Sequence, residues 1–295
     1  MIHYNNCPVC GSSEIQQQLT ATDHTVSGKQ FAIWHCNACT ARFTQDIPEL
    51  AGIGEFYKSE NYISHSDTKK GFINSLYHLV RNRTLAAKRK LLIKQTGLLK
   101  ASLLDIGCGT GAFLNDMKQH GWAVAGLEPD ETARGKAKEL YGLEPLSIEE
   151  LFNQPTGSFN AITMWHVLEH VHDLHGYMDQ LKRILAPAGK IFIAVPNYTS
   201  YDATIYGSHW AAYDVPRHLY HFSPTSMKLL VEQHGLKLDL IKPMWFDSYY
   251  VSMLSEQYKN GKGSIVRAFW NGLMSNKRAW SDKTRCSSEI YIISK

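Results

Sequence analysis

Two pairs of cysteines near the start of the 295-residue chain have the spacing of a metal site. In each pair two residues separate the thiols, and the four positions are Cys7, Cys10, Cys36 and Cys39. Two such pairs facing each other complete a tetrahedral shell of four thiolates, which Zn²⁺ fills without leaving a position for substrate. Four ordinary thiols or a redox pair are the alternatives. The spacing favours structural Zn²⁺ in a zinc ribbon over residues 1–46, a segment too small to fold on its apolar core alone.

A glycine-rich loop further along the chain has the pattern of a turn that cradles a nucleotide. Three glycines stand at alternate positions, namely Gly107, Gly109 and Gly111. A short apolar strand that contains Asp105 precedes them, and a helix is expected to begin at Ala112, so the backbone can approach a ligand in front of a helix N-terminus. A second expected strand, 122–127, leads into Glu128, whose carboxylate is placed to accept both hydroxyls of a ribose.

Two cofactors fit this loop. Because the glycines also satisfy the dinucleotide fingerprint G-x-G-x-x-G/A, they leave NAD open. Asp105 favours S-adenosylmethionine, since a carboxylate would repel a pyrophosphate but not an ammonium or sulfonium group. Gly111 is expected to open the loop further for the amino-acid part of that cofactor.

The run D-I-G-C-G-T-G at 105–111, followed by G-L-E-P-D at 126–130, resembles class I S-adenosylmethionine-dependent methyltransferases. Residues 165–171 and 216–222 resemble the branch related to ubiquinone-biosynthesis methylases. The likeness covers roughly residues 98–245 and the C-terminal strand. A zinc ribbon in front is similar to that of deoxysugar C-methyltransferases, although their full catalytic motif is missing. The resemblance implies an α/β fold, a Rossmann-like seven-stranded sheet with helices on both faces, preceded by a small zinc-ribbon domain.

The resemblance also implies where the elements and the cofactor lie. The matching strands are 101–106, 122–127, 144–147, 159–165, 190–195, 236–242 and 289–294. The expected divisions are the ribbon at 1–46, a linker with N-terminal helices at 47–97, and the methyltransferase domain at 98–295, with a lid insertion at about 197–222 and another insertion at about 246–285. The implied cofactor contacts are Asp105, Gly107, Cys108, Gly109, Gly111, Glu128, Pro129, Ser147, Ile148 and His166. Among them the aspartate and the loop would surround the methionine part, Glu128 the ribose, and Ser147 and Ile148 the adenine.

Candidate catalytic side chains follow the fourth and fifth strands. His166 comes directly after the fourth strand and is expected beside the reactive methyl group. A purely structural role for this histidine is an equal alternative. The lid insertion is rich in aromatic residues, which is typical of a cover over an active site. Its candidate catalytic residues are Arg217, His218, Tyr220 and His221. Arg217 is expected to bind an acidic group of the acceptor or to pair with Asp214 or Asp202 as a strut. Glu169 is expected to orient its loop rather than to react.

A helical pattern begins at Phe72 and is expected to end at Gly97. Its apolar face comprises Ile73, Leu76, Tyr77, Val80, Ala87 and Leu91, and its basic face Arg81, Arg83, Lys88, Arg89, Lys90 and Lys94. We interpret the basic face as solvated, with an anion or nucleic-acid contact as the alternative.

Composition limits the class of protein. Thirty-one Lys and Arg against 27 Asp and Glu give a formal charge of +4, too small an excess to indicate a nucleic-acid partner by itself. Apolar runs of about six residues are far shorter than the roughly 20 that a membrane span needs, and no secretory signal is visible. We therefore expect a cytoplasmic protein without a membrane span.

Together these patterns predict transfer of a methyl group from S-adenosylmethionine to an O or C acceptor on a small molecule, such as a sugar, quinol, phenol or lipid-linked compound. One alternative is an RNA methyltransferase whose ribbon and basic helix bind phosphates. Residues 163–166 read T-M-W-H where amino-methylating nucleic-acid enzymes resemble [DN]-P-P-[YF], which disfavours nucleobase methylation. A non-catalytic zinc-ribbon interaction protein and a nicotinamide enzyme are the remaining alternatives. The sequence determines neither the acceptor nor the oligomeric state.

Overall fold

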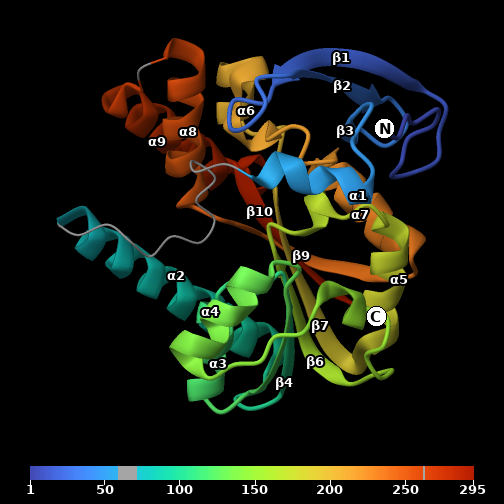
Figure 1. Cartoon of the computed structure of the whole chain (residues 1–295), viewed down its shortest axis with the longest axis vertical. Coiled ribbons are helices and arrows are strands. Elements are labelled where there is room, and N and C mark those ends of the chain that lie inside the picture. Colours follow the sequence, from blue (N-terminus) through green and yellow to red (C-terminus); the bar gives the residue numbers. More distant parts are fainter. Residues whose placement is uncertain (59–71, 262) are drawn as a thin grey trace. The chain divides into compact units, whose positions relative to one another are not determined.

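The computed structural model describes residues 1–58, 72–261 and 263–295, and within 72–82 it describes the backbone alone. The side chains of the predicted apolar residues from Ile73 to Val80, and that of Arg81, therefore lie outside the described part of the chain. The described strands form a four-stranded sheet of order β1-β2-β3-β8 and a six-stranded sheet of order β5-β4-β6-β7-β10-β9 (Figure 1).

The chain groups into two compact units, each built from several segments. The ribbon unit comprises Met1–Tyr62, His166–Met178 and Ile193–Ile293, and the glycine-loop unit comprises Ile63–Trp165, Asp179–Phe192 and Ser294–Lys295. The ribbon unit therefore contains the lid segment (residues 197–222) as well as the four cysteines.

In the ribbon unit, a meander of three antiparallel strands carries the cysteines. It consists of β1 (Ile15–Thr22), β2 (Gln30–Cys36) and β3 (Arg42–Thr44). The sequence QFAIWHC of β2 alternates, so that Phe31 and Ile33 are buried while Gln30 faces solvent. The fourth strand is β8 (Tyr220–His221) from the lid segment, where Phe43 pairs with Tyr220 and Arg42 with His221.

The lid segment is a buried part of the ribbon unit. It forms α6 (Tyr201–Tyr206), η4 (Gly207–His209), η5 (Ala211–Tyr213) and β8. Trp210 and Tyr213 pack in one apolar cluster with Phe31 and Ile33 of β2. The tyrosines and tryptophan that indicated a lid from sequence thus fill a core between the ribbon and the chain around it.

The rest of the ribbon unit consists of short helices and strands. Before the lid segment come α1 (Leu50–Ile53), η1 (Gly54–Tyr57) and η3 (Leu168–His170), and after it α7 (Pro224–Gln233), β9 (Lys237–Pro243), α8 (Asp247–Asn260), α9 (Ile265–Ser281), η6 (Lys283–Arg285) and β10 (Ser288–Ser294). Ser223 caps α7 in a capping box, followed by Pro224 at the first helical position. The predicted insertion at about 246–285 forms the helical hairpin α8–α9 and the short η6.

The glycine-loop unit is built around parallel strands. Its elements are α2 (Phe72–Thr96), β4 (Ser102–Ile106), α3 (Ala112–Gln119), β5 (Ala123–Leu127), α4 (Glu131–Tyr141), η2 (Ile148–Leu151) and β6 (Phe159–Trp165). Helix α5 (Leu174–Ile184) and strand β7 (Leu185–Pro196) follow, each shared between the two units. Strand β4 pairs in parallel with both β5 and β6, which places Asp105 opposite Gly126 on one side and Thr163 on the other.

The α/β fold expected from the sequence is confirmed, but among the described residues its sheet has six strands where seven were expected. Residues 144–147, expected as a strand, contribute a single parallel bridge between Leu127 and Leu146. The helix expected from Phe72 is present, and Gly97 ends it with φ 70° and an N–H that donates to Ile93 O at 2.9 Å. Within the described residues no helix is both long and apolar enough to cross a membrane.

Candidate functional site

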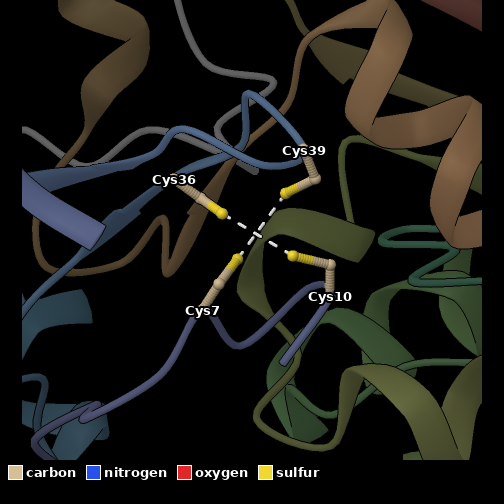
Figure 2. A group of neighbouring side chains, drawn as sticks. All are labelled: Cys7, Cys10, Cys36 and Cys39. Atoms are coloured by element: carbon tan, nitrogen blue, oxygen red, sulfur yellow. Dashed lines mark hydrogen bonds between the residues drawn. The ribbon is translucent and has the colours of Figure 1, made fainter. Parts of the chain in front are cut away.

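The four predicted cysteines converge on one point (Figure 2). The sulfur atoms of Cys7 and Cys39 lie 3.6 Å apart, as do those of Cys10 and Cys36, and all four lie within 4.8 Å of one another. A tetrahedral zinc site with Zn–S bonds of about 2.3 Å requires sulfur separations of about 3.8 Å, whereas a disulfide requires about 2.05 Å. The cluster therefore fits a closed structural Zn²⁺ site, as the spacing predicts.

Two tight turns position these thiols. Gly11 N–H donates to Cys7 O at 2.8 Å, and Thr40 N–H donates to Cys36 O at 2.9 Å. Both donor residues have positive φ, 76° for Gly11 and 62° for Thr40. This left-handed conformation closes each of the two tight turns. The hydrogen bond between Cys7 and Cys39 lowers the pKa of Cys7 and raises that of Cys39, because the two sulfur atoms share one proton.

The glycine loop folds back against the end of β5. Gly107 N–H and Cys108 N–H both donate to Leu127 O, at 2.7 and 3.1 Å, and Gly107 has a φ of 71°. The Cys108 sulfur would lie 2.8 Å from a Cβ added at Gly126, so the thiol packs against β5. Burial raises the pKa of that thiol far above its usual value, so the loop offers its backbone rather than a nucleophile.

Gly111 serves a different purpose from the one expected. A Cβ at this position would lie 2.9 Å from Leu143 Cδ1 and 3.2 Å from Ala137 Cβ, and φ is 79°. The missing side chain therefore lets α3 begin close to α4, and it does not widen the loop toward a ligand.

Glu128 is fixed at the end of β5 with both oxygens in use. Its Oε2 accepts from Gly109 N–H at 2.8 Å and its Oε1 accepts from Asp130 N–H at 3.0 Å. Because a carboxylate oxygen has more than one acceptor site, each can still accept from a ribose hydroxyl. The next residue, Pro129, precedes Asp130, which caps α4 by accepting from Thr132 N–H and Ala133 N–H.

The predicted adenine contacts lie next to this carboxylate. Glu128 N–H donates to Leu146 O at 2.9 Å, so Ser147 and Ile148 follow directly after the residue that pairs with the end of β5. Ser147 is half-buried, and its hydroxyl donates to Glu149. The structure thus brings together the glycine loop, Glu128 and the Ser147–Ile148 pair, all within one unit.

Asp105 is a buried carboxyl group beneath the loop, with 2% of its surface exposed. Thr163 on β6 donates its hydroxyl to Asp105 Oδ1 at 2.5 Å. Burial raises the pKa of Asp105 to about 7 and the charge of Glu128 adds to this, whereas the Thr163 hydrogen bond and the charge of Lys88 oppose it. Near neutral pH this group is therefore balanced between its neutral and ionised forms, and a cationic ligand favours the ionised one.

The contacts of Thr163 and Lys88 with Asp105 were not predicted from the sequence. The ammonium group of Lys88 lies 4.1 Å from the ring centroid of Trp165 and 5.9 Å from that of Phe113, a cation–π arrangement. Phe113 is buried, as expected of a core residue. From sequence Lys88 belongs to a solvated basic face, and only the packing of α2 shows that it faces the aromatic side chains and Asp105.

His166 lies between two carboxylates of the ribbon unit. It has a φ of 58°, and its backbone N–H donates to Ala194 O at 2.9 Å. Its Nε2 lies 2.9 Å from Asp247 Oδ2 and its Nδ1 lies 3.5 Å from Glu169 Oε1. Burial lowers the pKa of His166, but the hydrogen bond and charge of Asp247, followed by those of Glu169, raise it to about 10. The imidazole is therefore a cation at neutral pH.

Glu169 also belongs to a second group of possible metal ligands, with His170 and His218. Glu169 is fully buried, and its Oε1 lies 3.5 Å from His166 Nδ1 and 4.0 Å from His218 Nε2. His218 Nδ1 lies 2.8 Å from Ala212 O, and His170 Nδ1 lies 3.1 Å from Arg217 O, so both rings can donate Nδ1–H and leave Nε2 as an acceptor. Two such imidazoles and a carboxylate are a donor set that divalent transition metals accept.

The other candidates from the lid segment make internal contacts. Arg217, 1% exposed, donates from Nη2 to Asp214 at 2.6 Å and to Asp23 at 3.1 Å, and from Nη1 to Phe56 O at 2.8 Å. These contacts match the strut alternative through Asp214. Asp202 does not join them, since it accepts from Trp210 Nε1 at 2.8 Å.

Tyr220 and His221 occupy β8 and are buried. Tyr220 donates its hydroxyl to His172 O at 3.3 Å, and His221 Nε2 lies 3.1 Å from Thr44 Oγ1. Burial lowers the pKa of His221 well below its usual value, so this ring is neutral. Their role in catalysis stays a prediction, and their observed contacts join the lid segment to β3.

Comparison with known proteins gives a consistent result. A family model described as a methyltransferase domain matches residues 77–241. A ubiquinone biosynthesis O-methyltransferase from Xanthomonas oryzae pv. oryzae is 29% identical over 168 residues, covering 52% of this chain and 69% of that protein. The mitochondrial ubiquinone biosynthesis O-methyltransferase of Homo sapiens is 27% identical, with 52% of this chain and 46% of the human protein covered.

Solved structures share the fold at low sequence identity. A Galdieria sulphuraria protein assigned as a sarcosine dimethylglycine methyltransferase superposes with a TM-score of 0.50 at 15% identity, covering 75% of this chain and 87% of that one. At this identity the likeness concerns the fold alone.

Proposed function

The chain belongs to the methyltransferase-domain family, whose model matches more than half of it, and from that premise we propose that it methylates an oxygen atom of a small molecule. It is an S-adenosylmethionine-dependent methyltransferase. Relatives named ubiquinone biosynthesis O-methyltransferases support an oxygen acceptor, with a quinol or phenol as the first compounds to test. A hydroxyl of a sugar or of a lipid-linked compound falls within the same proposal, and a carbon acceptor is the alternative to it.

The observation that carries the proposal is the arrangement of two acids around the glycine loop. Asp105 lies buried on β4 beneath the loop, and Glu128 at the end of β5 accepts from the loop backbone at Gly109. In the proposed complex Glu128 accepts the ribose hydroxyls, and Asp105 provides the negative charge for the methionine part. The bound cofactor supplies an activated methyl group on a positively charged sulfur.

His166 and Asp247 are the proposed residues on the acceptor side. His166 follows Trp165, the last residue of β6, without an intervening residue. Of the two carboxylates beside it, Asp247 is the accessible one, with 24% of its side chain exposed against none for Glu169. Because both imidazole nitrogens face carboxylates and the ring is cationic, His166 is suited to holding Asp247 in place, and Asp247 to accepting the hydrogen of an acceptor hydroxyl.

The described part of α2 does not favour the RNA alternative. Lys88 lies against Trp165, and Arg89 forms an ion pair with Asp116. At least these two members of the basic face are engaged within the protein, and we retain the small-molecule acceptor.

The test measures S-adenosylhomocysteine formation with a panel of quinols, phenols and sugars, together with equilibrium binding of S-adenosylmethionine. Asp247→Asn is expected to lower kcat at least about tenfold, with cofactor affinity unchanged. Asp239→Asn, on β9, is the matched control and should change neither quantity. If the protein binds the cofactor tightly but methylates none of the panel compounds, these acceptor classes are rejected. If Asp247→Asn leaves kcat unaltered, Asp247 does not take part in acceptor activation.

A further inference from the structure

Helix α9 has the reverse of the usual burial pattern. Its buried residues are Ala268, Gly272, Ser275, Asn276 and Ala279, which are small or polar. Six of its large apolar residues are exposed, and we name them the α9 stripe: Ile265, Val266, Phe269, Trp270, Leu273 and Trp280. The exposed fractions are 79% for Ile265, Val266 and Trp280 and 60% for Trp270. A helix that needed only a place in the core would bury these side chains instead.

The reason for this reversal is the close approach of α9 to α8 (Figure 1). A Cβ at Gly272 would lie 2.8 Å from Tyr249 Cδ1 and 3.0 Å from Tyr249 Cα, so only a glycine fits between the helices there. Ser275 donates its hydroxyl to Asp202 at 2.7 Å, and Asn276 donates to Trp245 O at 2.9 Å. These contacts fix which face of α9 is inward, and the stripe consequently lies outward.

Positive charge is concentrated along the same segment. Between residues 257 and 285 the chain has seven Lys or Arg and one acidic residue, Asp282, which is a formal charge of +6. The whole chain carries only +4, so all the other residues together carry −2. Arg267 and Lys277 on α9, and Lys283 and Arg285 in η6, are exposed. The excess of positive charge in this protein is thus located in the segment that contains the α9 stripe.

We infer that the α9 stripe binds the surface of an anionic lipid bilayer. A helix with exposed Trp, Phe and Ile and with basic residues beside them lies in the interface plane, its apolar face at the acyl boundary and its cations near lipid phosphates. Protein interfaces are depleted of charged residues at their core, whereas this segment has seven basic residues and one acid, which favours an anionic surface. The inference does not depend on the methyl acceptor.

The test is flotation of the zinc-loaded full chain with phosphatidylcholine vesicles, with and without phosphatidylglycerol. Wild type is expected to float with the anionic vesicles and to dissociate as salt is raised. The variant Val266→Ser/Trp270→Ser/Trp280→Ser should lower the bound-to-free ratio at least about tenfold, because three interfacial anchors are lost. Arg267→Gln/Lys277→Gln/Lys283→Gln should lower it by about tenfold or more on anionic vesicles alone.

The matched control is Leu99→Ser/Leu140→Ser/Phe152→Ser, which removes three exposed apolar side chains of the glycine-loop unit. It should bind vesicles as wild type does. Zinc content and the thermal midpoint confirm that each variant is folded. Equal flotation of the stripe variant and wild type would overturn the inference. The inference would also be overturned if wild type does not float and sediments as a dimer, while the stripe variant sediments as a monomer. The stripe would then be the interface with a second copy of the chain.

Discussion

The cofactor loop and the lid segment differ in how far along the chain their partners lie. Glu128 accepts from Gly109, 19 residues away, and Asp105 accepts from Thr163, 58 residues away. In the ribbon unit Arg217 donates to Asp23, 194 residues away, and His221 contacts Thr44, 177 residues away. The first region is assembled from neighbouring strands and helices, whereas the second closes only when segments far apart in the chain meet.

This difference changes the role of the polar side chains. In the loop, the backbone donors and two acids lie within one short stretch of strand and turn, and the cofactor-binding role that we propose for them follows from their types and order. In the lid segment, Arg217 and His218 face other protein groups, and their side chains are taken up by carboxylates and carbonyl oxygens. A cluster of His, Tyr and Arg is therefore evidence of an active site only after its internal partners have been found. We therefore expect changes in the cysteine cluster and the lid segment to alter stability first, and changes in the loop to alter affinity first.

The largest expected effect is the loss of zinc. Cys36→Ser removes one ligand at the end of β2 and should abolish stoichiometric zinc, with a fall of at least about 10 °C in the thermal midpoint, because the metal supplies much of the stability of this sheet. Cys286→Ser, a buried thiol outside the cluster, is the control and should keep the zinc. Zinc content is measured by mass spectrometry of the native protein. Full stability after chelation would contradict the structural role.

Arg217→Met should be nearly as damaging to the ribbon unit. Removing the guanidinium leaves Asp23 and Asp214 without their cation, and breaking a buried ion pair in this way costs about 3–5 kcal/mol. Denaturant unfolding measures the loss, and Arg83→Met, at an exposed position on α2, should be neutral. A raised KM for the acceptor with unchanged unfolding free energy would instead assign Arg217 to acceptor binding.

Glu128→Ala should weaken binding of S-adenosylmethionine about 100-fold or more. The reason is the loss of two charge-assisted hydrogen bonds to the ribose, each worth about 1.5–3 kcal/mol, where 1.4 kcal/mol is a factor of ten. Isothermal titration calorimetry measures the affinity. Glu144→Ala, an exposed carboxylate after α4, is the control. If affinity is unaltered in Glu128→Ala, the cofactor does not lie where we propose.

A smaller effect is expected from pH. The pKa of Asp105 is about 7, and a cationic cofactor binds its ionised form, so protonation competes with binding. As pH falls from 8 to 6 the ionised fraction drops about tenfold, and the affinity for S-adenosylmethionine should drop by the same factor. Asp105→Asn should bind more weakly at pH 8 and should lose this dependence. A flat profile in wild type would show that Asp105 does not sense the cofactor's charge.

The smallest effect concerns Lys88. Its positive charge lowers the pKa of Asp105, so Lys88→Met should move the midpoint of the pH profile upward by less than about one unit. Lys90→Met, an exposed neighbour on α2, should leave the midpoint in place. The midpoint comes from the same calorimetric titrations at several pH values. An unshifted midpoint would mean that Lys88 contributes only its contact with Trp165.

The sequence by itself determined the features that depend on a few neighbouring residues. Paired cysteines at fixed spacing form a four-thiolate cluster wherever their two turns meet, and a strand followed by alternating glycines forms a ligand-binding turn before a helix. For the same reason Gly97 marks the end of α2 correctly. Such signals depend on backbone conformation and on side chains only a few positions apart.

Only the tertiary structure decided which of the remaining polar and aromatic residues face each other. The strand expected at 144–147 is a single bridge at Leu146, and the lid segment pairs with β3 through Tyr220. Lys88 lies beside Trp165, and Asp247 beside His166, although nothing in their local sequence sets them apart from other charged residues. The physical reason is that burial and charge pairing depend on distances between segments far apart in the chain, and these distances exist only once the sheets and helices have packed.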